Sequence, residues 1–241
     1  MPLIKLDAVS STNDFLKELA QSTNPENFTV VSAESQTAGR GQMGSKWISE
    51  KGKNLTMSVL IKNPLSDITE MYNLNIVVVL SVIAALEAYK IPKLSIKWPN
   101  DIMSGNKKIG GILIENIVKS TGDIISIVGI GLNVNQTDFS ALPKASSLRV
   151  ETDVTFDKFE LLQNITNEII TAVPKIESRM EILREDYLSK LFKKGIPMAF
   201  EKEGVKFMGI IQNVTKTGRL ELLLEDDSTC SYEIKEITML Y

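Results

Sequence analysis

The chain of 241 residues lacks histidine altogether and contains a single cysteine, Cys230. Without histidine there is no Ser-His-Asp or Cys-His nucleophile, no imidazole general base and no histidine-ligated zinc site. Cys230 cannot form an internal disulfide, and no cation close to it in the sequence would activate its thiol for catalysis. The enzyme classes that remain use lysine, arginine, carboxylates, backbone donors or a metal held by oxygen.

A long apolar run, a secretory signal and a strong excess of charge are missing as well. The longest apolar run, Ile76–Leu86, is too short to span a bilayer. With one cysteine and no secretory signal, the chain is expected in a reducing compartment, most simply the cytoplasm. The net charge of −3 argues against general polyanion binding, but positive charge is gathered in residues 36–47 and 93–111. Two basic segments in a chain of net negative charge indicate that the protein binds one small anionic ligand.

Hydrophobic spacing alternates between strand-like and helix-like segments as far as residue 192, and then shows only short strands separated by turns. One long helix is expected to begin at Ser66 or Asp67 and to end near Tyr89. The pattern predicts an α+β fold, with a mixed β-sheet flanked by helices in residues 1–192 and a small β domain in residues 193–241. Strands are expected near residues 3–9, 28–34, 55–61, 94–98, 109–118 and 124–134, and helices after Ser11-Thr12-Asn13 and within residues 156–191.

Residues Gln36–Trp47, here called the glycine loop, combine three glycines with two cations and no acidic residue. The spacing Gly39-x-Gly41-x-x-Gly44 matches a dinucleotide-binding fingerprint, which requires a strand before it and a helix after it. Residues 45–54 have no helical spacing, so that interpretation fails. The glycine loop is then either an anion-binding loop, whose tryptophan can cover a flat ring, or a solvated turn.

Two further motifs place polar groups at strand ends. In Lys97–Asp101 the proline ends a strand and leaves Asn100 and Asp101 free to act, although an ordinary hairpin with an Asx turn is the alternative. In Val128–Asn135 two glycines interrupt a strand. Glycine weakens a strand unless a ligand or another backbone approaches closely, and a β-bulge is the alternative here.

Taken together in this order, these motifs resemble biotin protein ligases, in the short, ligase-only form without an N-terminal helix-turn-helix domain. The resemblance covers nearly the whole chain and implies a catalytic domain in residues 1–192 and an SH3-like β-barrel in residues 193–241. It implies that biotin and MgATP form biotinyl-5′-AMP, and that the biotinyl group then passes to a lysine of a biotin carboxyl carrier protein or carboxylase domain. No nucleic acid or membrane partner is expected, and the resemblance allows a monomer or a homodimer.

The resemblance also implies residue roles, with Mg²⁺ as cofactor and no identified metal ligands. The expected catalytic residues are Arg40, Lys108, Lys97 and Asp101. The expected biotin-binding residues are Ser11, Thr12, Asn13, Gln36, Gly39, Arg40, Gly41, Gln42, Lys108 and Gly111. The expected ATP-binding and adenylate-binding residues are Gly44, Trp47, Asn100, Asp101, Gly129, Gly131 and Asn133.

The chain departs from the family pattern at Gln42 and Ser45, where many members carry arginines. Glutamine donates a hydrogen bond but neutralises no charge, so weaker retention of the adenylate is predicted. Two other functions stay open. A lipoate or octanoate ligase or transferase shares the superfamily fold, and a non-catalytic biotin-binding protein would need only the biotin residues.

Overall fold

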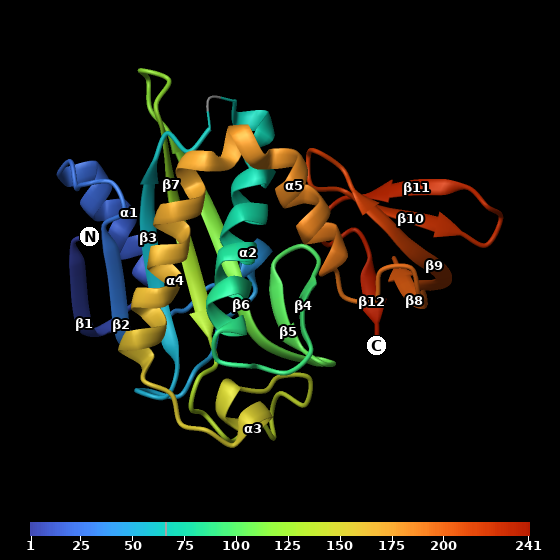
Figure 1. The fold of residues 1–241 in the computed structure, drawn as a ribbon, viewed down its shortest axis with the longest axis horizontal. Helices are drawn as coiled ribbons and strands as arrows, with labels where there is room; N and C mark the ends of the chain where they lie inside the picture. Colours follow the sequence, from blue (N-terminus) through green and yellow to red (C-terminus); the bar gives the residue numbers. More distant parts are fainter. Residues whose placement is uncertain (66) are drawn as a thin grey trace.

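The computed structural model describes residues 1–65 and 67–241. Its larger part is a seven-stranded sheet in the order β1-β2-β3-β7-β6-β5-β4, with helices on both faces (Figure 1). Only β1 and β2 pair in parallel, so the sheet is mixed as predicted. The strands are β1 (Leu3–Val9), β2 (Val30–Gln36), β3 (Leu55–Lys62), β4 (Leu94–Lys97), β5 (Asp101–Ser104), β6 (Lys107–Val118) and β7 (Ile124–Leu132).

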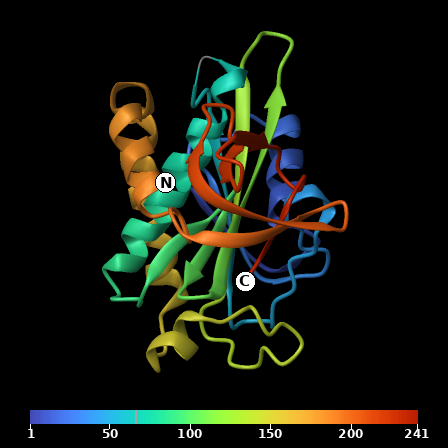
Figure 2. The ribbon, with the colours of Figure 1, turned by 90° about the vertical axis from the view of Figure 1, so that its right-hand side faces the viewer.

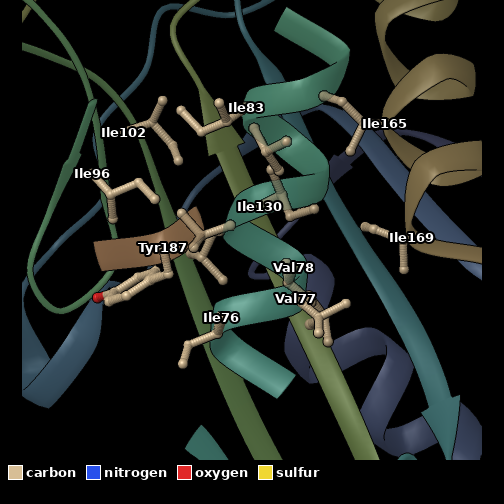
Figure 3. Packing of buried hydrophobic residues seen from close by; sticks show 14 of the residues in the cluster. Ile76, Val77, Val78, Ile83, Ile96, Ile102, Ile130, Ile165, Ile169 and Tyr187 are labelled. Carbon is tan, nitrogen blue, oxygen red and sulfur yellow. The ribbon is translucent and has the colours of Figure 1, made fainter. Parts of the chain in front are cut away.

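The helices cover the two faces of this sheet unequally. Helix α1 packs on one face, where Leu16 and Ala20 meet Leu60 and Ile127 in a small core. Helices α2, α4 and α5 share the opposite face, where α2 packs on the sheet with α4 and α5 on either side of it (Figure 1). With the sheet beneath it and a helix on each side, α2 is buried nearly all round, and Figure 3 shows part of this packing. The helices are α1 (Thr12–Ser22), α2 (Tyr72–Glu87), α3 (Leu148–Thr152), α4 (Lys158–Ala172) and α5 (Ile176–Ser189). No helix in the described part of the chain is both long and apolar enough to cross a membrane.

The start of α2 differs from the sequence prediction. The expected cap at Ser66 lies outside the described residues, and Asp67 accepts a hydrogen bond from Thr69 N at 2.8 Å instead of opening the long helix. This side-chain bond closes a local turn, a short 3₁₀ turn follows at Ile68–Glu70, and α2 begins at Tyr72.

The C-terminal part is a five-stranded antiparallel sheet in the order β11-β10-β9-β8-β12. Figure 2 shows the molecule with this part toward the viewer. Its interior stacks Phe200 on Phe207, and Phe207 on Tyr232, with ring centroids 5.8 and 5.9 Å apart. The predicted fold class, a helix-flanked mixed sheet followed by a small β unit, is confirmed. The strands are β8 (Pro197–Lys202), β9 (Val205–Val214), β10 (Leu220–Leu224), β11 (Thr229–Tyr232) and β12 (Thr238–Leu240).

The turn between β9 and β10 joins the two parts. Trp98 Nε1 donates to Gly218 O at 2.8 Å in a buried hydrogen bond. Gly218 has φ +90, and a Cβ there would lie 2.3 Å from the Tyr72 ring, so only glycine fits. Arg184 of α5 donates to Thr215 O at 3.4 Å and is held by α2. The small sheet is therefore seated directly beside the strand end that carries Trp98.

Candidate active site

A cavity of about 340 Å³ lies where the glycine loop, the ends of the central strands and the small sheet meet. The neighbouring strands β5, β6 and β7 bring together residues that are far apart in the sequence. From the larger part of the molecule, the lining includes Ser11, Thr12, Asn13, Gln36, Arg40, Gly41, Gln42, Ser45, Lys46, Trp47, Lys97, Asn100, Asp101, Lys108, Gly111, Gly129 and Gly131.

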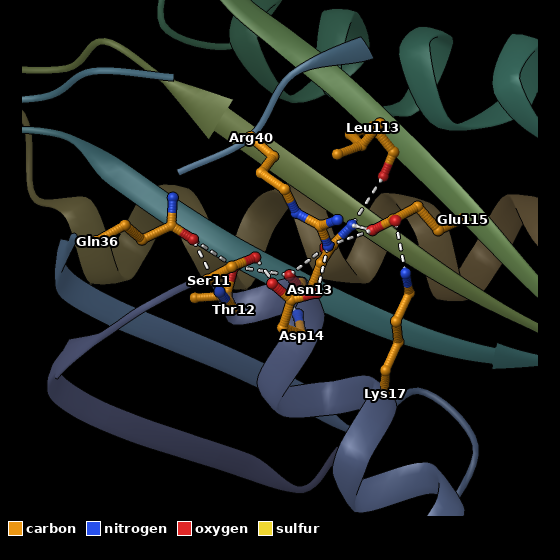
Figure 4. Close-up of polar contacts among 10 residues, drawn as sticks. Ser11, Thr12, Asn13, Asp14, Lys17, Gln36, Arg40, Leu113 and Glu115 are labelled. Carbon is orange, nitrogen blue, oxygen red and sulfur yellow. Dashed lines mark hydrogen bonds and ion pairs between the residues drawn. The ribbon is translucent and has the colours of Figure 1, made fainter. Parts of the chain in front are cut away.

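Uncharged polar groups gather around the start of α1 (Figure 4). Ser11 caps the helix by accepting a hydrogen bond from Asp14 N, which confirms the predicted helix start. Gln36 Oε1 accepts from Thr12 N at 2.8 Å and from Thr12 Oγ1 at 3.1 Å. Ser58 Oγ lies 2.7 Å from Thr12 Oγ1 and 2.6 Å from Asn13 Oδ1. These donors and acceptors are fixed before any ligand arrives, which favours recognition of a small polar head group.

Arg40 points back toward α1 and β6, while its side chain stays 40% exposed (Figure 4). Its guanidinium contacts the Asp14 carboxylate and lies 3.2 Å from Glu115 Oε2. Glu115 also pairs with Lys17 at 2.5 Å and accepts from Asn13 Nδ2 at 2.7 Å. Burial raises the pKa of the Glu115 carboxyl, but the hydrogen bonds from Lys17 and Asn13 outweigh it and hold that pKa below its usual value. Glu115 is therefore an ionised anchor for the arginine.

A second charged group lies at the junction of β4, β5 and β6. Asp101 Oδ1 is 2.6 Å from Lys108 Nζ, and Asp101 Oδ2 is 3.6 Å from Lys97 Nζ. Asn100 is buried, its side-chain amide donates to Ile112 O, and its backbone oxygen accepts from Ile112 N at 3.1 Å. The predicted hairpin thus presents Asp101 and two lysines to the cavity, with the lysines oriented by one carboxylate.

The indole of Trp47 packs against the sheet and so holds the end of the glycine loop beside it. Its indole lies so near Gly131 that a Cβ there would be 2.6 Å from Cε2, and its ring centroid is 5.9 Å from Lys108 Nζ. Trp47 Nε1 is buried and has no protein hydrogen-bond partner in the described part of the chain. No helix follows the loop, since only a 3₁₀ turn at Gln42–Gly44 precedes β3, so the dinucleotide fingerprint is excluded as predicted.

Three of the predicted site residues do not line the cavity, namely Gly39, Gly44 and Asn133. Gly39 is buried against Trp47 O, Gly44 sits at the loop tip with φ +80, and Asn133 Nδ2 donates to Ser146 O at 2.9 Å. All other predicted site residues line it. Their binding roles stay predictions.

The sequence makes the junction of the two parts a possible place for a site, but it identifies no residue of the small sheet that lines the cavity. The apolar residues of this sheet alternate as in any small β core, so no local signal shows that some of them face another part of the molecule. The lining residues from this sheet are Phe200, Leu220, Ile234, Lys235, Ile237, Thr238 and Met239.

Three comparisons with known proteins bear on this site. A model of the biotin/lipoate A/B protein ligase family matches residues 6–135. The bifunctional ligase/repressor BirA of Bacillus spizizenii is 36% identical over 167 residues, which is 68% of this chain and 51% of that protein. This chain therefore spans about half the length of that relative. The biotin–acetyl-CoA-carboxylase ligase of Mycobacterium tuberculosis is 27% identical over 223 residues, which is 90% of this chain and 82% of that protein.

Among solved structures, the biotin protein ligase from Aquifex aeolicus in complex with biotin and ATP superposes with a TM-score of 0.82 at 31% identity. The superposition covers 99% of this chain and 98% of that one, so it includes the large sheet and the small one. Since the family model also matches more than half of the 241 residues, the chain belongs to the biotin/lipoate A/B protein ligase family.

Proposed function

We propose that the protein activates biotin with MgATP to biotinyl-5′-AMP and transfers the biotinyl group to a lysine of a biotin carboxyl carrier protein. One observation carries the proposal. A single cavity joins the fixed hydrogen-bonding groups of Thr12, Asn13 and Gln36 to the cations Arg40 and Lys108, with Trp47 beside them. The polar head group of biotin, its carboxylate and the adenine of ATP match these three kinds of side chain in turn.

The head group of biotin would form hydrogen bonds with four polar side chains, those of Ser11, Thr12, Asn13 and Gln36. Its urea needs both donors and acceptors inside a dry pocket, and these four side chains offer both. Ser11, Thr12 and Asn13 are each at most 4% exposed. Thr12 is held by Gln36 and Ser58, and Asn13 is held by Ser58 and Glu115. Binding therefore requires little further ordering of these side chains.

Adenylation requires the biotin carboxylate oxygen to attack the α-phosphorus while pyrophosphate leaves. The two reactants are both anions, so cations fixed near the reacting atoms lower the barrier by neutralising their repulsion. Arg40 would hold the carboxylate, and Lys108 would stabilise the charge that develops on the α-phosphate. Asp101 orients Lys108 through the 2.6 Å ion pair.

Magnesium enters this proposal as part of the substrate MgATP. No three His, Cys, Asp or Glu side chains of the described residues cluster as a metal site. Mg²⁺ characteristically binds nucleotide phosphates with one or two carboxylates and water, and Asp101 is the lining carboxylate available for that.

In the second half-reaction the neutral amine of the carrier lysine attacks the carbonyl of the mixed anhydride, an amide forms, and AMP leaves with the bonding electrons. Relatives named as acetyl-CoA-carboxylase ligases support a carboxylase carrier as the acceptor. We also propose that the chain divides near residue 192 into a catalytic domain and a C-terminal SH3-like domain.

ATP–pyrophosphate exchange tests this proposal. Exchange should depend on biotin and should be negligible with lipoate or octanoate, since a lipoate or octanoate enzyme is the alternative within the family. Lys108→Met should abolish exchange, whereas Lys107→Met should not, because Lys107 is exposed and its side chain contacts Pro143 O outside the cavity. Tight biotin binding without any exchange would indicate a non-catalytic biotin-binding protein and would refute the ligase assignment.

A further inference from the structure

The small sheet reaches the glycine loop through one side chain. Lys235 Nζ donates to Met43 O at 2.7 Å, which joins positions 192 residues apart in the chain. Lys235 lies in the turn between β11 and β12, and Met43 lies at the tip of the glycine loop. Lys235 also lines the cavity together with the loop residues Gln42 and Ser45. The contact therefore ties the loop to the opposite wall of the site.

The turn that carries Lys235 is held firmly. Glu236 N donates to Glu233 O at 3.1 Å, and Glu233 N donates to Glu236 Oε2 at 2.8 Å. Lys202 of β8 pairs with Glu236 Oε1 at 2.6 Å and, by this hydrogen bond above all, holds the pKa of the Glu236 carboxyl below its usual value. The small sheet as a whole is seated by the buried bond from Trp98 to Gly218. Lys235 is thus presented from a fixed support.

The loop tip, in contrast, is held mainly by itself. Gly41 N donates to Ser45 O at 2.7 Å, and Ser45 Oγ donates to Gln42 O at 2.8 Å. For residues 41–46, the bond from Lys235 is the one polar contact that reaches outside the loop within the described part of the chain. Met43 is 71% exposed, so burial of its side chain adds little. Gln42 and Ser45 carry no charge with which the tip itself could hold a phosphate.

We propose that Lys235 is a positioning residue that keeps the glycine loop closed over the cavity and so retains biotinyl-5′-AMP until the carrier lysine arrives. The inference rests on the proposed ligase function. Lys235 acts through the Met43 carbonyl and takes no part in the bond changes. The small sheet then sets how long the adenylate stays on the enzyme, and the catalytic residues on the large sheet set how fast it forms.

The test is a chase of labelled adenylate from the full-length chain. The enzyme forms labelled biotinyl-5′-AMP from biotin and MgATP with pyrophosphatase present, excess unlabelled biotin is added, and bound label is followed with time. One hydrogen bond from a charged donor at an exposed site corresponds to roughly three- to tenfold in an equilibrium. Lys235→Met should therefore release label about three- to tenfold faster. Lys235→Arg should release it at close to the wild-type rate, because arginine restores the donor.

Lys206→Met is the matched control, since Lys206 is also exposed on the small sheet but lies outside the cavity lining. Brief trypsin digestion supplies a readout independent of catalysis. Arg40 and Lys46 are the tryptic sites of the loop, and cleavage after them should be faster in Lys235→Met than in the control.

Unchanged release and unchanged cleavage in Lys235→Met would overturn the inference. A rise in the KM for ATP with unchanged release would also overturn it, because Lys235 would then act on the nucleotide directly. If the wild-type chain forms no biotinyl-5′-AMP at all, the ligase proposal fails instead, and the digestion still reports on the contact between Lys235 and the loop.

Discussion

Substitutions at Gly129 and Gly131 test the proposal that biotin binds at one end of the cavity and adenine at the other. The two glycines lie two residues apart on β7 and therefore on the same face of the sheet. A Cβ at Gly129 would lie 2.5 Å from Asn13 Oδ1, whereas a Cβ at Gly131 would lie 2.6 Å from Cε2 of Trp47. Neither glycine has a positive φ, so alanine is acceptable to the backbone at both positions. The same substitution should thus displace a biotin-side group at one position and an adenine-side group at the other.

The loss of binding in each variant depends on whether the side chain that meets the new methyl group can move away. Overpacking by one methyl group costs about 1–3 kcal/mol, or about 5- to 150-fold in an equilibrium constant. Asn13 is held at 2.6 Å by Ser58 and at 2.7 Å by Glu115, so Gly129→Ala should weaken biotin binding toward the upper end of that range. Trp47 can move with the glycine loop, so Gly131→Ala should raise the KM for ATP toward the lower end.

Titration calorimetry with biotin and exchange kinetics at varied ATP measure the two effects separately. Gly129→Ala should change mainly the biotin dissociation constant, and Gly131→Ala should leave that constant near the wild-type value. Thermal unfolding of both variants shows whether the sheet itself has been disturbed. Equal weakening of biotin binding in both variants, or no change in either constant, would refute the division of the cavity proposed here.

Three more tests concern Arg40, Gln42 and Glu115. Arg40→Ala should lower exchange activity at least about a hundredfold, yet should hardly change the unfolding temperature, because the Arg40 side chain is 40% exposed; full activity would refute its role. Gln42→Arg should slow the release of biotinyl-5′-AMP in the chase assay, and an unchanged rate would contradict the prediction of weak retention. Glu115→Gln should lower the free energy of unfolding by roughly 1–2 kcal/mol at neutral pH. Because the pKa of Glu115 is lowered in the folded state, its stabilising effect is present above the unfolded-state pKa and is lost as the pH falls through the folded-state pKa. The difference between Glu115→Gln and the wild type should therefore shrink toward zero in urea titrations at acid pH, and a difference independent of pH would show that Glu115 is not ionised as described.

Hydrophobic spacing was sufficient to predict the order and type of the main elements, because each strand or helix must place an apolar face on one core. It was insufficient for the start of α2, where Asp67 bonds to Thr69 in a short turn. The Tyr72 hydroxyl there also lies 2.8 Å from the hydroxyl of Tyr187, 115 residues away in the sequence. A local capping signal carries no information about such a partner.

The candidate site also has residues that could be predicted from the sequence and residues that could not. Many of the lining residues could be named because their motifs, in this order, resemble those of biotin protein ligases, and the neighbouring strands β5, β6 and β7 bring these motifs together. Asn133 belongs to the third motif, but its amide is used by Ser146 O, a partner that the motif does not reveal. Lys235 belongs to no motif, and its contact with Met43 depends on how the small sheet is seated. Such partners become visible only after tertiary packing.

The arrangement of charge explains how an acidic protein can hold several cations around one small cavity. Arg40 is balanced by Asp14 and Glu115, and Lys97 and Lys108 share Asp101. Each carboxylate lowers the cost of keeping a partly desolvated cation in the ligand-free protein, because an opposite charge replaces part of the lost hydration.

The same pairing has a consequence for catalysis. An incoming carboxylate or phosphate must compete with these acids, so part of its binding energy is used to redirect cations that are already in place. Lys46 lines the cavity with no ion pair to any described residue, and in the proposed reaction it is a cation that an approaching triphosphate meets without competition. The paired cations then suit the reaction centre, where position matters most, and Lys46 suits the first encounter, where long-range attraction matters most.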